Sequence, residues 1–309
     1  MKVLVTGSTG FVGSALTHAL SESKQFEVVC GVRKAKSSLM KTIVFDLESA
    51  FEIESQLAGI DVVVHCAARV HQMYDNGLAP LDAYRRMNTT ATLRLAEQAA
   101  AAGVKRFVFL SSIKVNGEQT LPGMPFTPQS KVCPDDPYGI SKYEAEQALL
   151  ALGQRSGMEI VIIRPPLVYG PGVRANFAKL VHIVQRGVPL PFGAIQNSRS
   201  LVYLGNLVDL MKVCLHHPKA ANQVFLVSDD EDISTTQLLQ KLAVAMGTKS
   251  RLVPVPAAWL MGLTKLLGKP EVGQRLCSSL QVDIRHTKET LDWTPPYRLG
   301  CALKHTVQK

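Results

Sequence analysis

The chain has 309 residues, 46% of them hydrophobic, and carries a formal net charge of +9. This length and composition can bury a large core, which excludes disorder as the main character and suits one large α/β domain or two interleaved ones. No apolar run reaches the roughly eighteen residues of a membrane span, and the start is too short for a signal peptide, so we expect a cytoplasmic protein with no membrane insertion.

Strand and helix patterns alternate through the first half of the chain. Short apolar runs predict six strands, at Lys2–Thr6, Phe26–Val32, Thr42–Phe45, Asp61–Cys66, Arg106–Leu110 and Glu159–Ile163. Helical patterns lie between them, first at Ser14–Leu20 and most clearly at Asn88–Ala102. This alternation predicts an α/β fold with a Rossmann-type, doubly wound parallel sheet.

The pattern changes after Arg164, where prolines at 165, 166, 171, 189 and 191 interrupt the alternation. Later segments indicate strands at Ser200–Tyr203 and Val224–Val227 and helices at Thr235–Met246 and Trp259–Leu267. The last helix is apolar enough to suggest a membrane segment, but its pattern is more typical of a packed core helix.

We therefore expect a smaller, interleaved C-terminal substrate domain. Residues 1–168 plus about 200–228 would bind the dinucleotide, and about 169–199 plus 229–309 would bind the substrate.

The basic residues and the cysteines do not cluster. Lys and Arg are scattered without a run interleaved with aromatic residues, so we expect no nucleic-acid partner. A basic surface fits phosphorylated small molecules equally well. The six cysteines form no CxxC pair and have no histidine at zinc-ligand spacing, which predicts reduced thiols and no metal site.

A glycine-rich turn, Gly7-Ser8-Thr9-Gly10-Phe11-Val12-Gly13, follows the first strand. Gly7 permits a tight reversal, Gly10 lets the backbone approach a pyrophosphate, and Gly13 lets the helix pack on the strand. The first amides of the helix would face the phosphate charge. An ordinary turn is the alternative, but this position favours a dinucleotide site. We expect cofactor contacts from Gly7, Thr9, Gly10, Phe11, Val12 and Gly13.

Residues after the next three strands are candidates for the rest of the cofactor site. The second strand ends without an acid, which would bond a ribose 2′-hydroxyl, and Arg33 could accept a 2′-phosphate instead. Arg33 thus favours NADP(H) over NAD, although it could stack on the adenine or face water. Asp46, beside Leu47, could accept from the adenine amino group or cap a helix. Ala67 and Ala68 leave room for the cofactor or simply pack.

Tyr138 and Lys142 lie four residues apart in a helical pattern, so their side chains share one face. A phenol with a pKa of about 10 is a poor base, but a nearby ammonium would favour the phenolate. Tyr138 could then act as acid and base on a hydroxyl whose carbon gives up a hydride. Ser111 and Ser112 close the fifth strand, where a hydroxyl could bond the reacting oxygen or cap a turn. Asn88 could cap its helix or brace the lysine.

These residues resemble the extended short-chain dehydrogenase/reductases, which carry a TGxxGxxG turn, a serine after the fifth strand and a YxxxK pair. The likeness extends to residues 291–295, Leu-Asp-Trp-Thr-Pro, which are similar to the LGWxP close of that family. Members mostly act on nucleotide-diphosphate sugars, and a homodimer through helices of the sheet domain is the family expectation.

The resemblance assigns roles to individual residues. It implies that Ser112, Tyr138 and Lys142 are catalytic and that Arg199 grips the substrate diphosphate. Tyr138, Lys142 and Asn88 would also contact the cofactor. We expect further substrate contacts from Ser112, Lys114, Asn176 and Arg275.

Departures from the family pattern narrow the reaction. The 4,6-dehydratases carry Asp-Glu where this chain has Ile113 and Lys114, so dehydration is disfavoured. Residues 111–117 and 164–172 most resemble a bacterial UDP-glucose 4-epimerase-like branch, which includes 4-ketoreductases that make N-acetylated 6-deoxyhexoses for surface polysaccharide. Leu167 stands where galactose epimerases usually have an asparagine, which argues against their standard substrate binding.

The resemblance therefore implies NAD(P)-dependent hydride transfer at C4 of a UDP-hexose or UDP-N-acetylhexosamine derivative. Arg33 favours a 4-ketoreductase of a UDP-4-keto-6-deoxy-N-acetylhexosamine, in which Tyr138 donates the proton. The alternative is a UDP-glucose or UDP-N-acetylglucosamine 4-epimerase that keeps NAD bound. A non-catalytic dinucleotide sensor or scaffold is a remote third hypothesis, and the presence of both Tyr138 and Lys142 argues against it.

Overall fold

A parallel sheet of seven strands forms the centre of the computed structural model, which describes residues 1–34, 40–70, 80–121 and 123–308. The strand order is β3-β2-β1-β4-β5-β6-β9, so the order reverses between β1 and β4. The bounds are β1 Lys2–Thr6, β2 Glu27–Val32, β3 Lys41–Val44, β4 Val62–His65, β5 Arg106–Leu110, β6 Glu159–Arg164 and β9 Gln223–Leu226. The predicted doubly wound α/β sheet is confirmed, with strand bounds that agree to within one or two residues.

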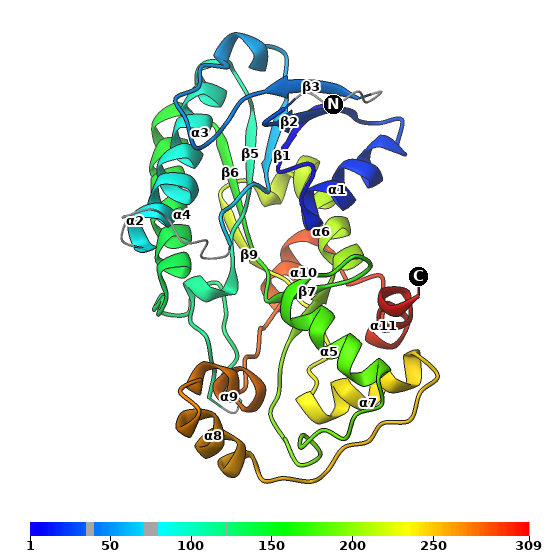
Figure 1. Cartoon of the computed structure of the whole chain (residues 1–309). Helices are drawn as coiled ribbons and strands as arrows, with labels where there is room; N and C mark the ends of the chain where they lie inside the picture. The colour runs from blue at the N-terminus through cyan, green and yellow to red at the C-terminus, as the bar shows by residue number, and fades with distance from the viewer. Residues whose placement is uncertain (35–39, 71–79, 122, 309) are drawn as a thin grey trace.

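Helices cover both faces of this sheet (Figure 1). On one face lie α1 Phe11–Ser21, α6 Leu204–His216 and α10 Arg285–Leu291, and on the other lie α3 Ala91–Ala101 and α4 Pro137–Ser156. Central strands are therefore buried on both sides, which explains why Val3, Leu4 and Val5 form an unbroken apolar run.

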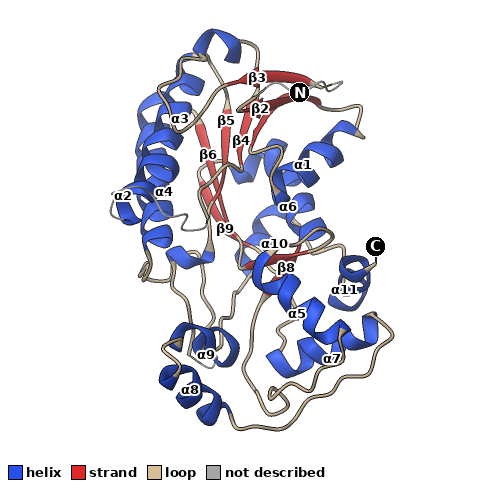
Figure 2. Cartoon of the chain, viewed as in Figure 1, coloured by secondary structure: helices blue, strands red, loops and turns tan. Residues whose placement is uncertain are grey.

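A second, smaller layer lies below the carboxyl ends of the strands (Figure 2). A two-stranded parallel sheet, β7 Leu167–Tyr169 with β8 Leu201–Tyr203, packs with α5 Ala175–Gln185, α7 Thr235–Ala245 and α11 Leu299–Val307 around a separate core. The sequence did not predict β7, because the prolines at 165, 166 and 171 mask so short a strand. The domain boundaries given above remain a prediction.

The remaining helices lie at the edges of the molecule. They are α2 Pro80–Tyr84, α8 Ala257–Leu266 and α9 Pro270–Cys277, with a π-helical turn at Arg85–Thr90 and short 3₁₀ turns at Glu54–Leu57, Ile113–Val115 and Pro218–Ala220. Among the described residues, no helix combines the length and the apolar character needed to cross a bilayer. The expectation that the segment at α8 is a packed core helix is wrong: within this fully described helix only Leu260 is buried, and Trp259 is 74% exposed.

A buried histidine sits between two threonines where β4 ends. The His65 ring accepts or donates at both nitrogens, 2.7 Å from Thr6 Oγ1 and 3.0 Å from Thr92 Oγ1. Burial, with a smaller contribution from the charge of Lys142, lowers the pKa of His65 from 6.5 to about 3. The ring therefore stays neutral in the folded protein at neutral pH.

This histidine predicts a loss of stability in mild acid. Between pH 6.5 and about 3, the unfolded chain binds a proton at His65 that the folded protein does not, so the free energy of unfolding falls as the pH falls. We expect urea denaturation at several pH values to show that His65→Gln removes this component of the pH dependence. The control is His18→Gln, at an exposed histidine. If the free energy of unfolding of His65→Gln kept the same slope against pH as that of the unmodified protein, the assignment would be contradicted.

Candidate active site

The glycine turn brings two backbone segments closer than any side chain would allow. Gly7 has φ of +67°, and a Cβ there would lie 2.7 Å from the amide nitrogen of Ala67, at the end of β4. A Cβ on Gly13 would lie 2.2 Å from the carbonyl oxygen of Gly7. The helix α1 begins at Phe11, and within its described first turn no acidic residue and no capping side chain occupies the free amides. The turn thus fits an anion such as a pyrophosphate.

Replacing Gly7 with alanine should cost more stability than a positive φ alone explains. The left-handed conformation costs an alanine about 1–2 kcal/mol, and the overlap with the backbone of Ala67 should add about 1–3 kcal/mol. Gly59 is a matched control, because its φ is +75° and a Cβ there meets nothing within 4 Å among the described residues. Urea denaturation of both variants measures the difference, and equal losses would contradict the close approach.

The other cofactor candidates lie near the same edge of the sheet. Arg33 is exposed just after β2. Asp46 is half-buried, and its Oδ1 accepts a hydrogen bond of 3.0 Å from the amide of Glu48, so it caps a turn rather than a helix. Leu47 packs in the core on the face of the sheet that α3 and α4 cover. Ala68 follows Ala67 and is half-buried. Cofactor contacts of these residues remain predictions.

Asn88 is not a helix cap. It is buried inside the π-helical turn that precedes α3. Its amide nitrogen donates to Ser141 Oγ at 3.0 Å and to the carbonyl of Arg69 at 3.1 Å, and its Oδ1 accepts from the amide of Arg69 at 2.8 Å. Ser141 precedes Lys142 on α4, so Asn88 ties the helix that carries the lysine to the segment after β4.

Tyr138 lies in the first turn of α4, beside the end of β5. The side chain of Asp136 caps the helix by accepting from the amide of Gly139 at 2.6 Å. The Tyr84 ring meets Tyr138 edge-on at 6.0 Å between centroids. Burial raises the pKa of Tyr138, the charge of Asp136 raises it further, and the nearby Ser112 side chain opposes both. Tyr138 is thus a neutral phenol here.

Lys142 lies one turn further along α4 and is buried. Its Nζ donates to the carbonyl oxygen of Leu110 at 2.8 Å and lies 4.3 Å from the centroid of the Phe109 ring. Burial lowers the pKa of Lys142 to about 7. The side chain therefore gains or loses its proton near neutral pH. The influence of this ammonium on the pKa of Tyr138 stays a prediction.

The structure separates the two serines that end β5. Ser111 is buried and donates to Glu146 Oε1 at 2.5 Å, and Glu146 is paired with Arg164 at 2.5 Å. Ser112 instead lies beside Tyr138, whose pKa it lowers, and its Oγ accepts from the amide of Lys114 at 3.3 Å. Ser112 is therefore the serine whose hydroxyl lies at the candidate reaction centre. Ser111 instead donates a hydrogen bond to the buried Glu146–Arg164 ion pair.

Two of the candidate substrate residues share an acidic neighbour. Lys114 Nζ pairs with Glu118 at 2.6 Å and with Asp136, the cap of α4. Arg199 donates through Nη1 to the carbonyl of Ser278 at 2.9 Å. Burial lowers the pKa of Arg199, and the charge of Glu118 opposes this. Both cations thus lie within the electrostatic reach of Glu118.

The other two candidate substrate residues lie on α9 and α5. Arg275 is exposed on α9 and pairs with Glu271 at 3.6 Å. Asn176 lies in the first turn of α5, and its side chain is outside the described part of the structure. Leu167, which departs from the epimerase pattern, is 41% exposed on β7.

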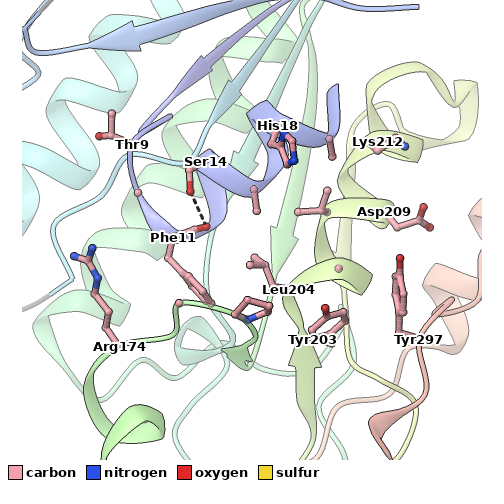
Figure 3. Close-up of a pocket in the computed structure, with 17 residues that line it drawn as sticks. Thr9, Phe11, Ser14, His18, Arg174, Tyr203, Leu204, Asp209, Lys212 and Tyr297 are labelled. Carbon is pink, nitrogen blue, oxygen red and sulfur yellow. Dashed lines mark hydrogen bonds between the residues drawn. The ribbon is translucent and has the colours of Figure 1, made fainter. Parts of the chain in front are cut away.

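A pocket of about 700 Å³ lies between α1 and α6, on the outer side of the glycine turn (Figure 3). Thr9, Gly10 and Phe11 line it from the turn, and Tyr203 and Lys212 line it from the opposite side. Within the described chain, its lining includes none of the three candidate catalytic residues. The pocket therefore adjoins the cofactor turn without coinciding with the reaction centre.

Sequence reasoning missed several residues that shape this site. Asp136 followed by Pro137 is a typical start of a helix and could have been recognised. The pairing of Glu146 with Arg164 spans two elements and has no local signal. Tyr84 precedes the π-helical turn, whose geometry single-sequence patterns do not reveal.

The geometry agrees with comparisons to known proteins. Residues 3–228 match the model of the family described as NAD dependent epimerase/dehydratase. The chain belongs to this family. The resemblance to extended short-chain dehydrogenase/reductases is thereby confirmed, and this family member is an NAD-dependent enzyme rather than a non-catalytic scaffold. These comparisons do not support the predicted preference for NADP(H) over NAD.

Individual relatives extend over nearly the whole chain. A UDP-glucose 4-epimerase of Vibrio cholerae is 51% identical over 309 residues, covering 99% of this chain and 94% of its own length. Two solved structures share the fold at lower identity. UDP-glucuronic acid 4-epimerase from Bacillus cereus with NAD has a TM-score of 0.78 at 22% identity, covering 99% and 97% of the two chains. UDP-glucose 4-epimerase from Thermotoga maritima with UDP-glucose has a TM-score of 0.76 at 23% identity, covering 99% and 97%.

Proposed function

We propose that this family member is a UDP-sugar 4-epimerase that keeps NAD bound and inverts C4 of a UDP-hexose or UDP-N-acetylhexosamine. The observation that carries the proposal is the 51% identity, over almost the entire chain, to UDP-glucose 4-epimerase of Vibrio cholerae. Tyr138 and the neighbouring Ser112 supply the hydroxyl groups that such a reaction needs for proton transfer.

The epimerase is favoured over the 4-ketoreductase, which Arg33 placed first in the sequence analysis. The relative at 51% identity is an epimerase, and the family is described as NAD dependent. Arg33 is exposed after β2 and is a single cation at a position where it could equally face water. The identity over the whole chain outweighs one residue, and we therefore reverse the order of the two hypotheses.

NAD, when bound, accepts the C4 hydride and returns it to the opposite face of the sugar. Gly7, Gly10 and Gly13 leave room for its pyrophosphate against the first amides of α1. Asn88 fixes the part of α4 that carries Lys142. Lys142, whose pKa lies near 7, would gain full charge on contact with ribose hydroxyls and a developing phenolate.

Tyr138 carries the proton in both directions. As the C4–H bond breaks, the 4-hydroxyl proton passes to the Tyr138 oxygen, and Ser112 bonds the oxygen that becomes the ketone. The keto sugar then turns over, and Tyr138 returns the proton as C4 regains hydrogen from the other side. Ionised Tyr138 is needed to start the cycle, so the burial that raises its pKa must be offset by positive charge.

Substrate recognition is assigned first to Arg199. We propose that Arg199 binds the diphosphate, because it is a half-buried cation at the junction of three chain segments. Lys114, Asn176 and Arg275 remain proposed substrate contacts. Because Leu167 has no amide group, we do not propose the substrate contact that an asparagine makes at this position in galactose epimerases.

A single experiment separates the two reactions. Purified protein is incubated in D₂O with UDP-glucose or UDP-N-acetylglucosamine and no added cofactor, and C4 is followed by NMR. An epimerase that returns its own hydride gives the C4 epimer with protium retained, and denatured protein releases stoichiometric NAD. A 4-ketoreductase gives no epimer and consumes added NAD(P)H with a 4-keto sugar, an outcome that would refute the proposal.

We also propose that residues 1–168 plus about 200–228 hold the dinucleotide, that about 169–199 plus 229–309 hold the nucleotide sugar, and that the protein is a homodimer. Light scattering at several concentrations would measure the assembly.

A further inference from the structure

Helix α8 presents apolar side chains to solvent. Trp259, Leu263 and Leu266 are 74%, 53% and 84% exposed. Their spacing of four and three residues places them on one face of the helix. Exposed single leucines are ordinary, but a contiguous row that includes a tryptophan indicates a contact surface.

The opposite face of α8 fixes this orientation. Leu260 is buried, and Thr264 packs so closely on α9 that a Cβ on Gly273 would lie 2.2 Å from the Thr264 hydroxyl. Figure 1 shows α8 outside α9, at the end of the molecule opposite β3. The α8–α9 hairpin therefore holds the row of Trp259, Leu263 and Leu266 outward, where none of the residues that the structure describes covers it.

Exposed cations flank the apolar row in the sequence. Residues 249–270 contain Lys249 and Arg251 before α8 and Lys265 and Lys269 at its end, with no aspartate or glutamate, and the next acid, Glu271, pairs with Arg275 on α9. All four are exposed. The long stems of Lys265 and Lys269 can extend away from an apolar layer and place their ammonium groups at its polar boundary.

We propose that α8 docks this protein on the surface of an anionic phospholipid bilayer. Tryptophan and leucine on one face with lysines beside them are the chemistry of a helix that lies in the plane of a membrane interface, and tryptophan is enriched at that depth. The charge distribution favours this partner, because Lys265 and Lys269 are attracted to anionic headgroups, whereas a second copy of the same face would bring the same two lysines against them. Docking of this kind places no segment across the bilayer.

Vesicle binding by the whole protein tests the proposal. The probes are vesicles of phosphatidylcholine alone and of phosphatidylcholine with phosphatidylglycerol, sedimented with protein at about 0.15 M salt. We expect binding to the anionic vesicles and weaker binding as salt rises. The chain has two tryptophans, and Trp293 is buried, so a blue shift of the fluorescence emission on binding would report Trp259 entering the interface.

Matched variants identify the surface responsible. Trp259→Ser/Leu263→Ser/Leu266→Ser should weaken binding by at least about tenfold. Lys265→Gln/Lys269→Gln should weaken it by about fivefold for each charge. The controls are Val244→Ser, at a side chain 76% exposed on α7, and Lys24→Gln/Lys304→Gln at two exposed lysines.

Three results would overturn the proposal. They are no binding to anionic vesicles, equal losses in the α8 variants and their controls, and a dimer in solution that the α8 variants dissociate. Epimerase activity is not a readout, so a failure of this proposal leaves the proposed function untouched.

Discussion

Replacing Tyr138 with phenylalanine should lower kcat by about 10²- to 10⁴-fold, the usual contribution of a positioned acid and base. The substitution removes one oxygen, the phenol oxygen that lies beside Ser112. The ring and its edge-on contact with Tyr84 at 6.0 Å remain possible. We therefore expect the fold, NAD content and UDP-sugar affinity to survive while turnover is lost.

Tyr143 supplies the control for this variant, because it lies on the same helix and is also half-buried. Tyr143→Phe should leave kcat unchanged to within about twofold, since surface substitutions away from a site have small effects. The measurement is steady-state epimerisation of both variants, with the NAD content of each protein determined after denaturation. A Tyr138→Phe enzyme with normal kcat and full NAD would place proton transfer on another group.

The sheet and its glycine turn were accessible from sequence because their signals are local. A strand buried on both faces needs an unbroken apolar run, as at 3–5, and the tight turn after it needs glycine at Gly7. The predicted bounds of Lys2–Thr6 and Arg106–Leu110 are exact, and those of the other predicted strands shifted by one residue, because an apolar run does not mark where strand pairing stops.

Only part of the candidate catalytic centre could be predicted from the sequence. Tyr138 and Lys142 have a spacing that sequence displays, whereas the division of labour between Ser111 and Ser112 depends on which way each side chain points. Adjacent residues in extended chain face opposite sides. No sequence pattern states that the side of Ser111 holds a buried carboxylate, so both serines had to remain candidates.

Helix α8 shows how a correct element can have a wrong environment. Its apolar pattern predicted a helix at Trp259–Leu267, and the structure has one at Ala257–Leu266. Periodicity reports that a face is apolar, but it does not report what covers that face. The inference that the helix was packed in the core assumed a cover that the described part of the chain does not supply.

Breaking the buried ion pair behind the active site should give the largest loss of stability. Arg164 donates to Glu146 at 2.5 and 2.9 Å, and both side chains are buried. Arg164→Met leaves the Glu146 carboxylate without its cation, and removing one partner of such a pair costs about 3–5 kcal/mol. Urea denaturation at neutral pH measures this as a lower free energy of unfolding.

The expected loss of stability comes from the unpaired, buried carboxylate of Glu146, and a second substitution can remove that charge. Arg164→Met/Glu146→Gln has no buried carboxylate, and its amide oxygen can still accept from Ser111, so the double variant should be more stable than Arg164→Met alone. The exposed pair of Lys241 and Glu231 is the control, where Lys241→Met should change stability by less than about 1 kcal/mol. A double variant no more stable than Arg164→Met would mean that packing of the arginine, and not its charge, holds this layer together.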